Sequence, residues 1–64
     1  MVTEFDEHIG LGVITDGAGR EYPFHCVELA DGSRTIEIGA DVEFHPLPKL
    51  GRVEAGQIAP LGSR

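Results

Sequence analysis

Glycines and prolines divide this chain into short segments in which apolar and polar residues alternate. Nine Gly and four Pro residues occur among 64, and no window keeps an apolar period of 3.6 residues over three helical turns. Alternation with a period of two, bounded by turn residues, is typical of β-strands. The pattern therefore predicts an all-β fold.

Five strands are expected, with turn signals between them. Asp16-Gly17 and Gly19 predict a tight turn between the second and third strands. A short irregular or 3₁₀ turn is expected at 27–30, followed by a loop at 31–33. The strands are expected at residues 1–6, 10–15, 21–26, 41–47 and about 52–61.

Prolines set conditions on two of these strands. In the third, Tyr22 and Phe24 lie on one face and Pro23 and His25 on the other, so an exposed edge or a bulge is expected near the proline. In the fourth, the apolar residues at 42 and 44 share a face, and the prolines at 46 and 48 are expected to end the strand.

A closed barrel is the simplest way to bury so few residues. Five short strands cannot form two packed sheets of useful size, whereas closure removes the exposed edges and gives one core. We expect a single domain over 1–64, a small five-stranded antiparallel Greek-key barrel of the OB-fold type. Its core is expected to hold Val2, Ile14, Tyr22, Phe24, Leu29, Ile36, Val42, Phe44 and Ile58, with Val53 and Ala55 as further candidates.

Charge and cysteine content narrow the function and the compartment. The net charge is -6 and the five Lys and Arg residues are scattered, so the long-range field repels phosphate, although base stacking can act despite it. Cys26 is the single cysteine, so no internal disulfide forms. No apolar run reaches the roughly 18 residues of a membrane helix, and the acidic N-terminal segment does not fit a signal peptide. We expect a soluble cytoplasmic protein without a membrane partner.

Several runs, taken in order, are similar to one known family. Residues 10–15 (Gly-Leu-Gly-Val-Ile-Thr) match a motif usually written Lys-Gly-Phe-Gly-Phe-Ile, and residues 22–25 (Tyr-Pro-Phe-His) match Val-Phe-Val-His. Later motifs of the same family are matched by residues 31–36, Gly39, 42–44 and 54–58. In these runs the chain resembles the cold-shock domain family over nearly its whole length. The resemblance implies an OB-fold barrel that binds single-stranded RNA or DNA.

The outward positions of that family are mostly replaced. By the resemblance, Glu4 stands where the family has a tryptophan, and stacking phenylalanines are replaced at 11, 13 and 23. Stacking is worth about 1–3 kcal/mol per base, so the losses predict weak binding. The replacements are largely apolar, and a clustered apolar patch often marks a partner site. The candidate residues for nucleic acid or a partner are Phe5, Ile9, Leu11, Val13, Pro23, His25 and Cys26.

Four of these candidates also have a structural interpretation. Leu11 and Val13 form either a docking patch or ordinary surface positions on a strand. His25 either contacts a base or is a half-exposed residue that completes a strand. Phe5 either stacks on a base or covers the rim of the core.

No arrangement in the sequence supports catalysis. His8, His25, His45 and Cys26 lack the spacing of a zinc site. His25 and Cys26 are adjacent on a strand and point to opposite faces, so they cannot share a proton well. We therefore expect no enzyme activity, no metal, no cofactor and no small-molecule substrate.

The sequence predicts a binding module. The first hypothesis is a cold-shock-like protein that binds single-stranded RNA or DNA with low affinity. The alternative is a protein–protein interaction module that docks through the altered apolar face, for example within the transcription or translation machinery.

Overall fold

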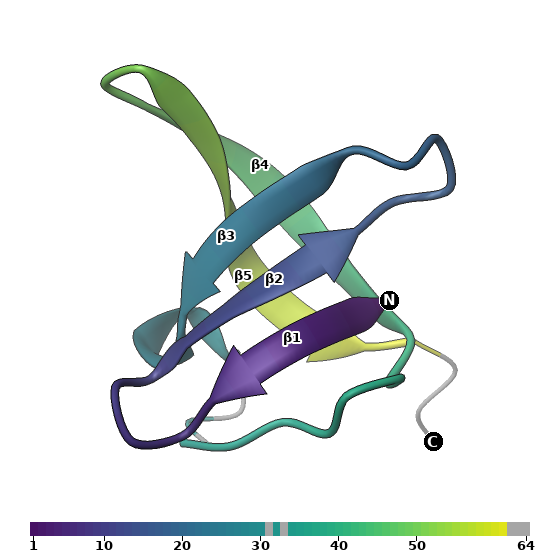
Figure 1. Cartoon of the computed structure of the whole chain (residues 1–64), viewed down its shortest axis with the longest axis vertical. Coiled ribbons are helices and arrows are strands. Elements are labelled where there is room, and N and C mark those ends of the chain that lie inside the picture. The colour runs from purple at the N-terminus through teal and green to yellow at the C-terminus, as the bar shows by residue number, and fades with distance from the viewer. Residues whose placement is uncertain (31, 33, 62–64) are drawn as a thin grey trace.

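The computed structural model describes residues 1–30, 32 and 34–61, and within them it is all-β apart from one short 3₁₀ helix. Strands β1 (Val2–Asp6), β2 (Leu11–Thr15) and β3 (Glu21–His25) form an antiparallel sheet in that order. Strands β4 (Val42–Lys49) and β5 (Arg52–Pro60) form a second sheet of two. Figure 1 shows the first sheet crossing in front of the β4–β5 pair. The all-β prediction is confirmed.

Each sheet is hydrogen-bonded to a chain segment that lies next to the other sheet in sequence. The Val2 N–H donates to the Ala40 carbonyl at 3.0 Å, next to the start of β4, and the Ala30 N–H donates to the Ile58 carbonyl at 2.7 Å. The strand ladders of the described residues remain two separate sheets. The described residues therefore form one three-stranded and one two-stranded antiparallel sheet, where the sequence predicted a single closed five-stranded barrel.

Side chains from both sheets form one core. Of the nine predicted core residues, six are buried, and Tyr22, Ile36 and Phe44 are partly buried and packed against them. The prediction for Val53 is wrong, because it is 42% exposed. It pairs with Pro48 near the tip of the β4–β5 hairpin, which projects away from the first sheet in Figure 1. The buried side chains are Val2, Ile14, Phe24, Leu29, Val42, Ala55 and Ile58.

Gly12 allows the first sheet to pack closely. A Cβ atom at this position would lie 2.5 Å from the Phe24 Cζ and 2.6 Å from the Glu4 carbonyl oxygen. Both distances are shorter than van der Waals contact, so only glycine fits beside the Phe24 ring.

The prediction that Pro46 and Pro48 end the fourth strand is wrong, because β4 continues to Lys49. β4 pairs only with β5 in its two-stranded sheet. Proline is tolerated on such an edge when its missing N–H faces away from the partner strand. The two prolines are two residues apart, so their nitrogens lie on the same side of β4.

Between β3 and β4 the chain differs slightly from the predicted boundaries. β3 ends at His25, and Cys26 begins a 3₁₀ helix, η1 (Cys26–Glu28), close to the turn expected at 27–30. In the loop expected at 31–33, Asp31 and Ser33 lie outside the described residues. Gly32 has a positive φ of 78°, a conformation that glycine adopts without strain.

Candidate functional site

The outward side chains of the first sheet lie in two rows. Antiparallel pairing places Glu4, Val13 and Pro23 opposite one another in one row. Directly opposed residues share a face of a sheet. The second row lies two residues further along each strand and holds Asp6, Leu11 and His25. We call these six residues the outer face.

The apolar members of the outer face are close together. Leu11 is 48% exposed and Val13 and Pro23 are half-buried. With Ile9, which is 59% exposed, they line a shallow groove of about 380 Å³ that also includes Glu4 and Asp6. Six of the seven candidate residues predicted from the sequence (Phe5, Ile9, Leu11, Val13, Pro23 and His25) therefore line this groove or the one beside it.

His25 completes β3 and remains accessible. It is the residue that precedes η1, and its Nδ1 accepts a hydrogen bond of 3.3 Å from the Val27 N–H. A neutral imidazole that accepts at Nδ1 carries its proton at Nε2. His25 therefore has a structural role, as one interpretation expected, and still presents an N–H donor beside Leu11.

The Phe5 ring packs toward the core, although Phe5 also lines the edge of the groove on the outer face. Its pairing partner is Gly12, and its ring stacks on Phe24 with centroids 5.9 Å apart and planes 10° apart. A bulge between Val2 and Glu4 shifts the alternation of β1, so both Val2 and Phe5 face the core. This geometry corresponds to the interpretation in which Phe5 covers the rim of the core.

Cys26 is separated from the outer face. It is half-buried at the start of η1 and packs against the core. Its N–H donates to the Gly10 carbonyl at 2.7 Å. Gly10 has a φ of 72°, and a Cβ there would lie 2.8 Å from the Cys26 Sγ. The thiol therefore packs against Gly10, the last residue of the β1–β2 turn.

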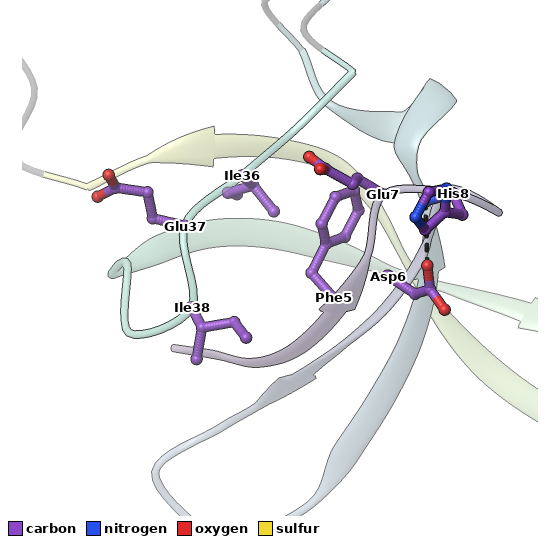
Figure 2. A pocket seen from close by; sticks show the side chains of 7 residues that line it. All are labelled: Phe5, Asp6, Glu7, His8, Ile36, Glu37 and Ile38. Carbon is purple, nitrogen blue, oxygen red and sulfur yellow. Dashed lines mark hydrogen bonds between the residues drawn. The ribbon is translucent and has the colours of Figure 1, made fainter.

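A second groove, which we call the acidic groove, lies past the end of β1. It has a volume of about 690 Å³ and is formed by residues 5–8 and 36–38. Figure 2 shows the Phe5 ring between these segments, with carboxylates of Glu7 and Glu37 at the rim. The Asp6 side chain accepts a 3.0 Å hydrogen bond from the His8 N–H. Three carboxylates make this groove unfavourable for phosphate.

Sequence reasoning missed two arginines near the outer face. Arg20 and Arg52 line a groove of about 470 Å³ between β3 and the part of the β4–β5 hairpin near its turn, together with Tyr22, Pro23 and Pro46. We call it the hairpin groove. The two residues are 32 positions apart and come together only through the packing of β3 beside the hairpin. Their positions next to the turns at 16–19 and 50–51 were the available signal.

In the part of the chain that the structure describes, no group of three or more His, Cys, Asp or Glu side chains is arranged to hold a metal ion. In the same residues, no helix is long and apolar enough to cross a membrane.

Comparison with protein-family models, curated proteins and solved structures gives no match for this chain. Its function therefore has to be argued from the outer face and the grooves around it.

Proposed function

We propose that this chain is a cold-shock-like OB-fold module that binds single-stranded RNA or DNA on its outer face, with low affinity. The observation that carries the proposal is the register of β1, β2 and β3. It places Leu11, Val13, Pro23 and His25 side by side on one exposed surface. These are also the positions at which the resemblance in sequence implies contact with bases.

Backbone contacts between the sheets support barrel closure. Val2 bonds in both directions to the segment before β4, since its N–H donates to Ala40 and its carbonyl accepts from Gly39 at 2.7 Å. At the other end, Leu29 forms a parallel bridge with Ile58 of β5. These contacts join β1 to the segment before β4, and β5 to the segment after η1, and both support a barrel closed on itself.

The outer face offers apolar contact and one polar donor. Aliphatic side chains and proline can pack against the flat side of a base, but they lack the aromatic stacking that is worth about 1–3 kcal/mol per base. His25 can add a hydrogen bond through Nε2. Glu4 and Asp6 stand in the same two rows and oppose phosphate. Low affinity follows from these three features together.

A titration with oligothymidine and with a mixed single-stranded RNA tests the proposal. The amide signals of Gly10–Val13 and of the neighbours of Pro23 should shift at micromolar oligonucleotide, and raising the salt should weaken the binding. Leu11→Asp should abolish the shifts. Leu61→Asp is the matched control, because Leu61 is a similarly exposed leucine (55%) that follows β5.

Two outcomes would contradict the proposal. One is the absence of any shift at millimolar oligonucleotide. The other is equal weakening by both substitutions, since that would show an effect of charge alone without a contact at Leu11.

A protein partner is the second candidate, and the carboxylates of the outer face favour it. Glu4 and Asp6 flank the Leu11–Val13 surface, so a segment with basic and apolar side chains would fit in charge and in hydrophobicity. A synthetic peptide that alternates Lys and Val is the probe. Shifts at Leu11 with this peptide, together with none from oligonucleotide, would select this function.

A further inference from the structure

The surface grooves beside β3 are continuous. A small groove lined by Leu11, His25 and Glu54 shares Pro23 and Arg52 with the hairpin groove. It also shares Leu11 and Pro23 with the groove on the outer face. A ligand that lies on Leu11 can therefore extend over Pro23 into the hairpin groove without leaving the surface.

Charge differs between the two ends of this path. At the β1 end, the charged side chains of the groove are the carboxylates Glu4 and Asp6. At the hairpin end, the lining includes Arg20, Glu21 and Arg52. An anion is therefore repelled at the β1 end, whereas at the hairpin end two guanidinium groups are present to attract it and Glu21 offsets part of their charge.

Both guanidinium groups can still accept a ligand. The Arg20 side chain is 75% exposed, and its Nε is 3.8 Å from an oxygen of Asp16, a long contact that solvent weakens. The Arg52 side chain is 65% exposed. Its Nε donates a hydrogen bond to the Glu54 Oε2, and one terminal nitrogen lies close to the same oxygen, both at 2.9 Å. A guanidinium carries five N–H donors, so donors remain on each arginine for phosphate oxygens.

We infer that the sugar–phosphate backbone of a bound single strand lies in the hairpin groove, with phosphates on Arg20 and Arg52, while its bases reach over Pro23 to Leu11. This inference rests on the proposed function and adds the path of the strand and the side on which its phosphates lie. The aromatic and proline residues of the groove, Tyr22, Pro23 and Pro46, pack against the sugars. The acidic β1 end limits contact to a few nucleotides.

The salt dependence of oligothymidine binding tests the inference. For single strands, each phosphate contact contributes about 0.7 to the slope of log affinity against log salt. Arg20→Gln and Arg52→Gln should each reduce the slope by about 0.7, and the double variant by about 1.4. Arg52→Lys keeps the charge and should keep most of the slope.

Arg34→Gln is the matched control. Arg34 lines a separate pocket with Cys26, Val27 and Leu29, beside η1, so this change removes the same charge away from the path and should leave the slope unchanged. Because Arg52→Gln also deprives Glu54 of its partner, the variant Arg52→Gln with Glu54→Gln checks that the effect is not misfolding. It should retain the native amide spectrum and the reduced slope.

The outcomes separate the two proposals. If oligothymidine binds and all the arginine variants keep the slope of the unsubstituted protein, the path through the hairpin groove is wrong and binding on the outer face stands. Equal loss of slope in Arg34→Gln would also overturn the path, because it would show that only net charge matters. If the unsubstituted protein does not bind oligothymidine, the proposed function itself fails.

Discussion

The two faces of the β1–β2–β3 sheet are built from alternate residues of the same strands, and they differ in how tightly each position is constrained. On the inner face, Ile14 and Phe24 are fully or almost fully buried, and Gly12 leaves no space for even one added carbon. On the outer face, Leu11 and its neighbours remain accessible. We therefore expect the inner face to be sensitive to substitution and the outer face to tolerate it without loss of the fold.

Phe24→Ala should give the largest effect of any single change in this sheet. Phe24 is 2% exposed and also holds the Phe5 ring, so truncation should cost about 3–5 kcal/mol. A chain of this length has a total stability of roughly 3–10 kcal/mol. Chemical denaturation should therefore show a loss of about 3–5 kcal/mol in the free energy of unfolding, which is a large share of the total or all of it.

Leu11→Ala is the control on the other face. It should change the free energy of unfolding by no more than about 0.5 kcal/mol. Equal destabilisation by the two substitutions would contradict the division into a constrained face and a free one.

Gly12→Ala tests the same division with a single methyl group. The new Cβ would overlap the Phe24 ring and the Glu4 carbonyl, and overpacking of this kind costs about 1–3 kcal/mol. The urea midpoint should fall accordingly. Gly17→Ala adds the same methyl group in the β2–β3 turn, where nothing lies within 4 Å, and should leave the midpoint nearly unchanged. A neutral Gly12→Ala would show that the inner face is more loosely packed than described.

Leu11→Phe combined with Val13→Phe sharpens the comparison from the outer side. Two aromatic rings on this face should raise the affinity for oligothymidine at least about tenfold, because stacking contributes about 1–3 kcal/mol per base. Fluorescence anisotropy with a labelled oligonucleotide measures the gain. Ile38→Phe adds a ring to the exposed side chain of the acidic groove and should give no gain. An unchanged affinity in the double variant would count against the outer face as the binding surface.

The alternation in β2, β3 and β4 was predictable because a strand has a fixed period of two. Tyr22 and Phe24 turn inward and Pro23 and His25 outward, as expected. The prediction followed from one strand at a time. It required no knowledge of which strand lay next to it.

Positions that depend on neighbouring elements were harder to predict. Phe5 lies on the inner face because of the bulge between Val2 and Glu4, although the three-residue spacing of two core-facing apolar residues was a signal for it. The extension of β4 through its prolines depends on which edge is unpaired. The meeting of Arg20 and Arg52 depends on how β3 packs beside the hairpin. A strict period of two within one strand does not predict these positions.

Asp16 has the smallest expected effect of the residues considered, and it acts on both faces at once. In the β2–β3 turn, its Oδ1 accepts hydrogen bonds of 2.9 Å from the N–H groups of Ala18 and Arg20. Its Oδ2 accepts one of 3.1 Å from the hydroxyl of Tyr22. Because these bonds fix the turn, they also fix the register that places residues on either face.

The charge of Asp16 makes this contribution depend on pH. The pKa of Asp16 lies below its ordinary value of 3.8, mainly because the carboxylate accepts a hydrogen bond from the Arg20 backbone N–H. The Ala18 N–H, the Tyr22 hydroxyl and the Arg20 charge lower this pKa further, and desolvation opposes them. A lowered folded-state pKa means that the ionised carboxylate favours the folded state. The contribution is complete above the ordinary value and is lost as the pH falls through the lowered one.

Asp16→Asn should therefore lower the melting temperature slightly at about pH 6, where the carboxylate is ionised. The difference from the unsubstituted protein should shrink as the pH falls below the ordinary value of 3.8. Asp41→Asn removes the same charge from an exposed aspartate before β4 and controls for net charge. A difference that stays constant over this pH range, or that Asp41→Asn reproduces, would mean that the Asp16 carboxylate does not hold the register and that packing on the inner face sets it alone.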